Sequence, residues 1–126
     1  MSELLMKTAN ALIAHCRNNT TDEGLETLYA PDCVSVEAMG MNGSDPETKG
    51  IEGIKGKHAW WDGAFEVHSL DVGDPMIHGS DRFACTFEMD CTDKESGERT
   101  QMKEIAIYTV NDAGKISREE FFYPFG

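Results

Sequence analysis

Basic residues are scarce in this chain, and their scarcity excludes two classes of partner. The 126 residues include 11 Lys and Arg against 23 Asp and Glu, which gives a formal net charge of −12. A surface of that sign repels the phosphates of nucleic acids and the headgroups of anionic membranes. We therefore expect neither a nucleic acid nor a membrane as partner.

Cysteines and long apolar runs are also few. The four cysteines show no CxxC spacing, so we interpret them as reduced, mostly buried side chains of a cytoplasmic protein. Residues 1–19 carry Glu3 and Lys7 among their apolar residues and have no small-residue cleavage site. This pattern predicts neither a signal peptide nor a membrane span.

Several motifs that would require a cofactor or metal are missing. The sequence has no glycine-rich phosphate loop, no serine or cysteine nucleophile motif, and no HxH or HExxH spacing. We therefore expect no cofactor and no metal. One metal arrangement stays open as an alternative, in which His68 and His58 join a carboxylate.

What the sequence does contain is the pattern of one α+β domain, residues 1–126. Apolar spacing predicts helices, and alternating residues after position 63 predict strands separated by hairpin turns. The expected helices are 3–17, 22–30 and one that begins at 51. The expected strands are 33–38, 65–77, 82–92, 99–110 and 115–123, with a loop at 39–50. This order predicts helices packed on one face of a curved antiparallel sheet.

Three glutamates lie in segments that should carry apolar side chains: Glu37, Glu104 and Glu119. A carboxylate on the inner face of a strand is costly unless it is paired, protonated or used. An even-length turn at 111–114 places Glu104 and Glu119 on the same face of the sheet, because directly opposed residues share a face. That face also carries aromatic and soft apolar side chains, so it predicts the lining of a pocket.

Three segments resemble a known family: LYAPDCVSVEAMG (28–40), GIEGIKGKHAWW (50–61) and YTVNDAGKISREEFFY (108–123). They are similar to the SnoaL-like group of the NTF2-like superfamily, which also holds ketosteroid isomerase and scytalone dehydratase. The resemblance implies the NTF2-like (cystatin-like) cone, a curved antiparallel sheet with three helices of the N-terminal half enclosing a pocket. It covers nearly the whole chain but implies no particular reaction, since the superfamily includes isomerases, cyclases, dehydratases, hydrolases and binding domains.

The resemblance also suggests roles for individual residues. The general base of ketosteroid isomerase falls at Glu37, and the tyrosine that supports its oxyanion hole falls at His58. The two donors of that hole fall at Ile13 and Ala106, so neither is present. The resemblance therefore implies a base without the electrophile of the isomerase, and it argues against steroid isomerisation.

Three carboxyls in one apolar cavity cannot all ionise, so one can serve as acid and another as base. We expect a small hydrophobic carbonyl compound as ligand, with Glu37 as base. The expected catalytic residues are Glu37, Glu104, Glu119 and His68; the expected ligand-binding residues are His58, Trp61, Phe87, Met89, Tyr108, Phe121 and Tyr123.

Three functional hypotheses stay open from the sequence alone. The first is a cofactor-independent acid–base enzyme of the isomerase, cyclase or dehydratase type. The others are a non-catalytic ligand-binding domain that uses the same pocket, and a dimeric scaffold whose cavity is filled. Ile105, Ile107 and Phe122 fall on the outer sheet face, so a homodimer through that face is expected.

Overall fold

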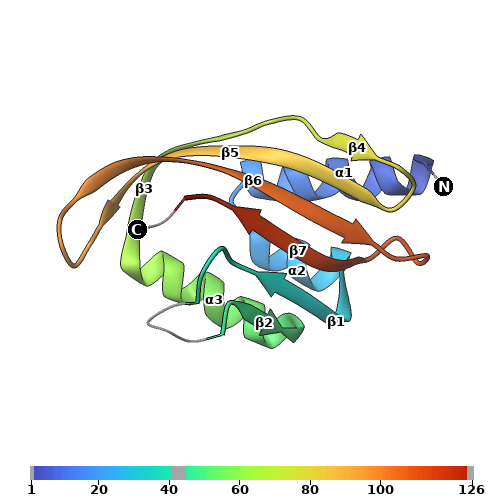
Figure 1. The fold of residues 1–126 in the computed structure, drawn as a ribbon, viewed down its shortest axis with the longest axis horizontal. Coiled ribbons are helices and arrows are strands. Elements are labelled where there is room, and N and C mark those ends of the chain that lie inside the picture. Colours follow the sequence, from blue (N-terminus) through green and yellow to red (C-terminus); the bar gives the residue numbers. More distant parts are fainter. Residues whose placement is uncertain (1, 41–44, 125–126) are drawn as a thin grey trace.

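Three helices and seven strands make up the part of the chain that the computed structural model describes, residues 2–40 and 45–124 (Figure 1). In chain order the elements are α1 (Ser2–Arg17), α2 (Thr21–Leu28), β1 (Tyr29–Val36), β2 (Glu47–Lys49), α3 (Gly50–Ala64), β3 (Phe65–Val72), β4 (Met76–His78), β5 (Arg82–Asp93), β6 (Arg99–Val110) and β7 (Ile116–Phe122). The predicted α+β class, with three helices in the N-terminal half, is confirmed.

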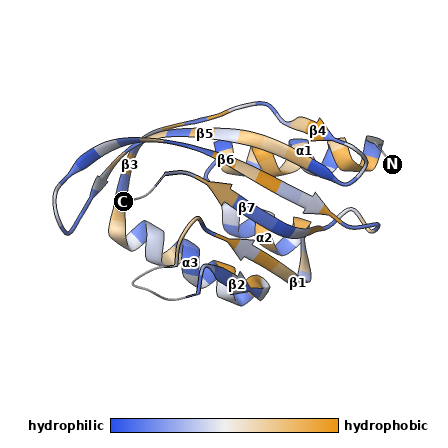
Figure 2. Cartoon of the chain, viewed as in Figure 1, coloured by the Kyte–Doolittle hydropathy of each residue, from blue (hydrophilic) through white to orange (hydrophobic). Residues whose placement is uncertain are grey.

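All seven strands join one curved sheet in the order β2-β1-β7-β6-β5-β3, and β4 pairs with β5. Neighbouring strands run antiparallel except β1 and β7, which run parallel. The hairpin of β5 and β6 extends beyond the helices, and its tip is strongly hydrophilic (Figures 1 and 2). Because β1 pairs with β7, the first long strand of the chain lies beside the last one.

The apolar stripe predicted for the first helix faces the core. Leu5, Ala9, Leu12, Ile13 and Cys16 are all buried. The Thr8 hydroxyl donates to the carbonyl oxygen of Gly114 at 2.8 Å, so α1 is also attached to the turn between β6 and β7. Within the described ranges, no helix is both long and apolar enough to cross a bilayer.

The second helix and the first strand meet earlier than the sequence predicts. α2 ends at Leu28, and Tyr29 already belongs to β1. Pro31 therefore does not end the helix; it lies inside β1, where the register with β7 shifts between Tyr29 and Val34. Proline has no N–H to donate to a ladder, and it is tolerated at this point because the regular pairing is interrupted there. β1 ends at Val36, so Glu37 follows the strand instead of lying within it.

A predicted strand is divided, and a predicted loop contains a strand. Gly73 and Pro75 separate β3 from β4 within the expected strand 65–77. A Cβ at Gly73 would lie 2.5 Å from the Thr86 hydroxyl oxygen, so this close approach requires glycine. The expected loop 39–50 contains β2, which pairs with the end of β1; residues 41–44 lie outside the described residues.

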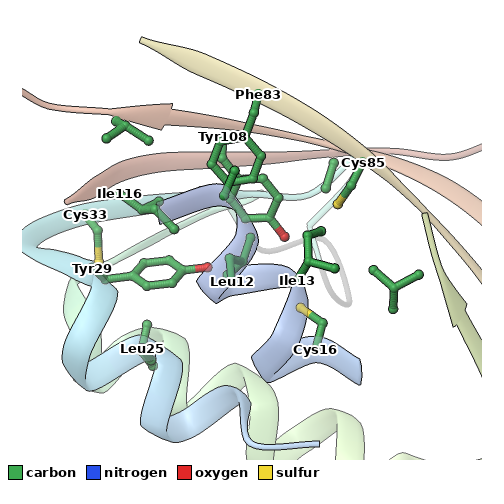
Figure 3. Close-up of a cluster of buried hydrophobic side chains, with 14 of the residues drawn as sticks. Leu12, Ile13, Cys16, Leu25, Tyr29, Cys33, Phe83, Cys85, Tyr108 and Ile116 are labelled. Atoms are coloured by element: carbon green, nitrogen blue, oxygen red, sulfur yellow. The ribbon is translucent and has the colours of Figure 1, made fainter. Parts of the chain in front are cut away.

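The hydrophobic core lies between α1, α2 and the inner face of the sheet, where Figure 3 shows the side chains converging. Phe83 and Tyr108 stack with ring centroids 4.8 Å apart. The Tyr108 hydroxyl points toward α1. The labelled core residues of Figure 3 are Leu12, Ile13, Cys16, Leu25, Tyr29, Cys33, Phe83, Cys85, Tyr108 and Ile116.

Gly114→Ala tests how tightly α1 is attached to the β6–β7 turn. Gly114 has a φ of +79°, and an added Cβ would lie 2.9 Å from the Leu4 side chain. We expect Gly114→Ala to lower the free energy of unfolding by about 1–2 kcal/mol in urea denaturation, because the backbone is strained and the exposed Leu4 side chain has to move aside.

Gly97→Ala is the matched control, since Gly97 has a φ of +76° and nothing within 4 Å of the added Cβ. It should cost only about 1 kcal/mol, the backbone strain alone. Equal losses in the two variants would show that the contact with α1 contributes nothing.

Candidate functional site

The predicted grouping of Glu104 and Glu119 on one sheet face is confirmed by the strand register. Tyr108 of β6 lies opposite Glu119 of β7, and Ala106 lies opposite Phe121. On the other side of β6, Glu104 lies opposite Phe87 of β5. Directly opposed residues share a face, so both glutamates lie on the inner face with the aromatic side chains.

Glu119 is the most deeply buried of the three glutamates, with 3% of its surface exposed. One carboxylate oxygen accepts a hydrogen bond from the Tyr29 hydroxyl, and the other accepts one from the Ser35 hydroxyl at 2.6 Å. Both donors lie on β1, and Ser35 is directly opposite Glu119 in the parallel register. Burial and the Glu119 charge together raise the pKa of Tyr29 well above its usual value.

Glu37 lies just beyond β1, where its backbone N–H donates to the carbonyl oxygen of Pro46 at 3.0 Å. The Lys57 ammonium of α3 donates to Glu37 Oε2 at 2.5 Å, and the Tyr123 hydroxyl donates to Oε1 at 2.8 Å. The side chains of Glu37 and Lys57 are each 22% exposed. Both oxygens of this carboxylate are therefore held in place.

Lys57 joins the two carboxylates into one network. Its ammonium also donates to the Ser35 hydroxyl at 2.6 Å, so hydrogen bonds run from Tyr29 through Glu119, Ser35, Lys57 and Glu37 to Tyr123. The ammonium lies 5.2 Å from the centre of the Phe121 ring. Lys57 is not among the predicted site residues, although its spacing of three residues from buried Ile54 puts both on one helix face.

Glu104 has a different environment. It is half-buried, and within the described part of the chain no group hydrogen-bonds to its carboxyl. Burial, the Glu37 charge and to a smaller extent the Glu119 charge together raise the pKa of Glu104 to about 7, against the opposing charge of Lys57. The Glu104 carboxyl therefore changes its protonation near neutral pH.

An open groove of about 380 Å³ lies where the parallel strands β1 and β7 end. Its lining includes Glu37 together with Phe121 and Tyr123, three of the predicted site residues. Val36, Ala38, Glu120 and Phe122 complete the lining. The hydrogen-bonded Glu37 carboxylate therefore lies beside a mainly apolar surface, which Glu120 also borders.

Comparison with known proteins agrees with this architecture. A family model described as the SnoaL-like domain matches residues 8–123. The chain belongs to the SnoaL-like family. A crystal structure from Mesorhizobium loti, named as a SnoaL-like polyketide cyclase [carbohydrate phosphatase], is 35% identical over 93% of this chain and 97% of its own, with a TM-score of 0.84. Among functionally curated proteins, none matches the chain.

Two further solved structures share the fold of this SnoaL-like domain at low identity. A Mycobacterium tuberculosis protein in complex with estradiol-17β-hemisuccinate is 16% identical over 97% of this chain and 95% of its own, with a TM-score of 0.75. A Catenulispora acidiphila protein with a ketosteroid isomerase-like fold, in complex with trimethylamine, is 20% identical over 94% of this chain and 85% of its own, with a TM-score of 0.71.

The predicted histidines of this SnoaL-like domain contact groups other than the three glutamates. His68 falls at the register shift in β3, and its Nε2 lies 2.7 Å from the Thr92 hydroxyl. His58 Nδ1 lies 2.9 Å from an Asp22 carboxylate oxygen, so it connects α3 to α2. The roles expected for His68 in catalysis and for His58 in ligand binding therefore remain predictions, and neither histidine has a hydrogen bond to one of the three glutamates among the described residues. In the described ranges, no cluster of three or more His, Cys, Asp or Glu side chains could hold a metal ion.

The other predicted ligand-binding residues of this SnoaL-like domain are mostly packed. Phe87 and Tyr108 belong to the buried core, and Met89 packs against it. Trp61 stacks on Phe65 with ring centroids 4.3 Å apart. Sequence patterning identified the inner face correctly, but it could not tell which inner residues the core covers and which remain beside an opening.

The pKa of Glu104 predicts how stability depends on pH. Because burial raises this pKa from 4.5 to about 7, the folded state binds a proton that the unfolded state has already lost in this range. The stability that this bound proton contributes is fully present below pH 4.5 and is lost as the pH rises through about 7. We expect Glu104→Gln, measured by urea denaturation, to match the parent protein at low pH and to exceed it by about 2 kcal/mol above pH 7.

Glu88→Gln is the control, because Glu88 is exposed and pairs with Lys103 on the outer face. Its stability should follow that of the parent protein at every pH. A difference between Glu104→Gln and the parent that stays constant with pH would contradict the raised pKa.

Proposed function

We propose that this SnoaL-like domain binds a small hydrophobic carbonyl compound at the groove and catalyses a cofactor-independent acid–base reaction on it. The reaction is of the isomerase, cyclase or dehydratase type. Glu37 is the general base, Glu104 is the neighbouring acid, and Glu119 supports both from the interior.

The observation that carries this proposal is the contrast between two neighbouring carboxyls. Glu37 is held by Lys57 and Tyr123 at the groove, whereas Glu104 has no hydrogen-bond partner among the described residues. Glu104 also has its pKa raised to about 7. Two neighbouring carboxyls in such different environments can serve as base and acid in the same reaction.

The proposed step moves one proton in each direction. A proton on the carbon next to the carbonyl passes to the Glu37 carboxylate, and the protonated Glu104 carboxyl gives its proton to the carbonyl oxygen. The product is the enol, which can then be reprotonated at another carbon, cyclise or eliminate water. Phe121 and Tyr123 supply apolar surface beside the carboxylate. His68 is left out of this step because its hydrogen bond is with Thr92.

The relatives support a small organic ligand in general terms. The Mesorhizobium loti protein is named as a polyketide cyclase, and the two distant structures hold estradiol-17β-hemisuccinate and trimethylamine. Polyketides contain carbonyl groups with acidic neighbouring protons, which suits a carboxylate base.

A non-catalytic ligand-binding role is the second candidate. Both oxygens of Glu37 accept short hydrogen bonds from protein groups. A carboxylate with both oxygens occupied has less capacity to take a proton from a ligand. Loss of the Tyr123 hydrogen bond on ligand binding is what would free Glu37 for catalysis.

Proton exchange on a simple ketone distinguishes the two roles. 2-Tetralone in D₂O, followed by NMR, reports deuterium entry beside its carbonyl and, through shifted protein signals, binding. We expect faster exchange with the protein than in buffer, and a loss of about 10²-fold or more in Glu37→Gln.

Exposed Glu47→Gln, on β2, is the control and should leave the exchange unchanged. Binding of 2-tetralone without accelerated exchange would favour the non-catalytic role. Neither binding nor exchange, with 2-tetralone and with larger bicyclic ketones, would contradict the proposed ligand class.

We also propose that two copies of the chain associate through the outer face of the sheet. Ile105 and Phe122 lie opposite each other on that face and are 44% and 49% exposed. Oppositely charged pairs flank them, with Lys103 near Glu88 at 3.4 Å and Arg118 near Glu120 at 3.2 Å. A two-fold interface needs a patch that complements itself, and an apolar centre with both charges around it meets that need.

Phe122→Asp should therefore convert a dimer into a monomer in sedimentation at micromolar concentration, because it places a charge in the apolar centre. Val67→Asp is the matched control, since Val67 is similarly exposed but lies opposite buried Cys91 on the inner face. A parent protein that sediments as a monomer would contradict the proposed association.

A further inference from the structure

The hydrogen-bond network leaves one strong donor unused. The hydroxyls of Tyr29, Ser35 and Tyr123 each have one proton, and each already gives it to a glutamate. Lys57 is different because an ammonium has three N–H donors, and two of them go to Ser35 and Glu37. Within the described part of the chain, no third acceptor lies within hydrogen-bond distance of Lys57 Nζ.

Lys57 is not one of the groove-lining residues, but its ammonium lies directly beside two of them. Its ammonium touches the Glu37 carboxylate, which lines the groove, and lies 5.2 Å from the centre of the Phe121 ring, which also lines it. The Lys57 side chain is 22% exposed. The ammonium is thus mostly shielded from water yet adjacent to the place where a ligand would lie.

We infer that Lys57 binds the carbonyl oxygen of the ligand with its third N–H, and that it prefers an oxygen that carries negative charge. This inference rests on the proposed function, because it adds a second donor to the carbonyl oxygen that Glu104 protonates in the same site. When Glu37 takes a proton from carbon, negative charge develops on the carbonyl oxygen, and a fixed cation next to that oxygen stabilises the charge.

The same geometry explains why this lysine, and not another on α3, has the role. Lys55 lies two residues earlier, and its ammonium pairs with Glu26 of α2 and with Glu52. Residues two apart on a helix face different directions. Lys55 therefore lies away from Glu37 and serves as a matched control on the same helix.

The competing interpretation is that Lys57 only neutralises buried carboxylates. Under that interpretation its removal would weaken the fold, but it would not change how the groove distinguishes a charged oxygen from a neutral one. A pair of probes of nearly equal shape separates the two interpretations. 2,4-Dinitrophenolate carries a negative oxygen at about pH 6, and 2,4-dinitroanisole carries a methyl ether in its place.

Calorimetric titration at about pH 6 keeps Glu104 protonated and the phenolate ionised. We expect the parent protein to bind the phenolate at least about tenfold more tightly than the anisole. Lys57→Met should lose this preference while still binding the anisole, which shows that the groove is intact. Lys57→Arg should retain part of it, and Lys55→Met should retain all of it.

Two results would overturn the assignment of Lys57 and leave the proposed ligand groove in place. One is a preference for the phenolate that survives in Lys57→Met, and the other is a parent protein that shows no such preference. Failure of the parent protein to bind either probe would contradict the groove as a site for hydrophobic ligands and, with it, the role of Lys57. Should Lys57→Met fail to fold, the comparison of Lys57→Arg with Lys55→Met still decides, since only the former should change the preference.

Discussion

The buried carboxylate of Glu119 determines how the first and last strands of the sheet are paired. A charge removed from water costs several kcal/mol unless hydrogen bonds compensate for it. Tyr29 and Ser35 provide those hydrogen bonds, and both lie on β1. β1 must therefore lie beside β7 in the register that puts Ser35 opposite Glu119. The parallel pairing of the first long strand with the last one satisfies this buried group.

The remaining features of the site follow from that pairing. Two residues beyond Ser35, the chain reaches Glu37 next to Tyr123, the residue that follows β7. The Ser35 hydroxyl also accepts from Lys57, so α3 is attached to the same point of the sheet. Three glutamates of identical chemistry thereby acquire three environments. Glu119 is buried and hydrogen-bonded, Glu37 is paired with a lysine, and Glu104 has a raised pKa and no hydrogen-bond partner among the described residues.

Much of the sheet was predictable because hairpins are local. The turn between β6 and β7 decides which residues lie opposite each other, and the placement of Glu104 and Glu119 on one face followed from that alone. The boundaries of β1 were wrong because its partner is about 85 residues away along the chain, and no local pattern reports a parallel pairing of that kind. Pro31, a usual stop signal, is compatible with β1 only because the register shifts around it.

Most of the helices and strands, the α+β class and the inner face that carries two glutamates were predictable from the residues alone, and a resemblance placed Glu37 near them. These properties depend on periodicity and on short turns, which act between residues close in the chain. The folded structure was needed to show that Lys57 links Glu37 to Ser35, that His58 and His68 contact other partners, and that Phe87 and Tyr108 are core. Burial and hydrogen bonding between distant segments set these outcomes, and such contacts exist only once the chain has folded.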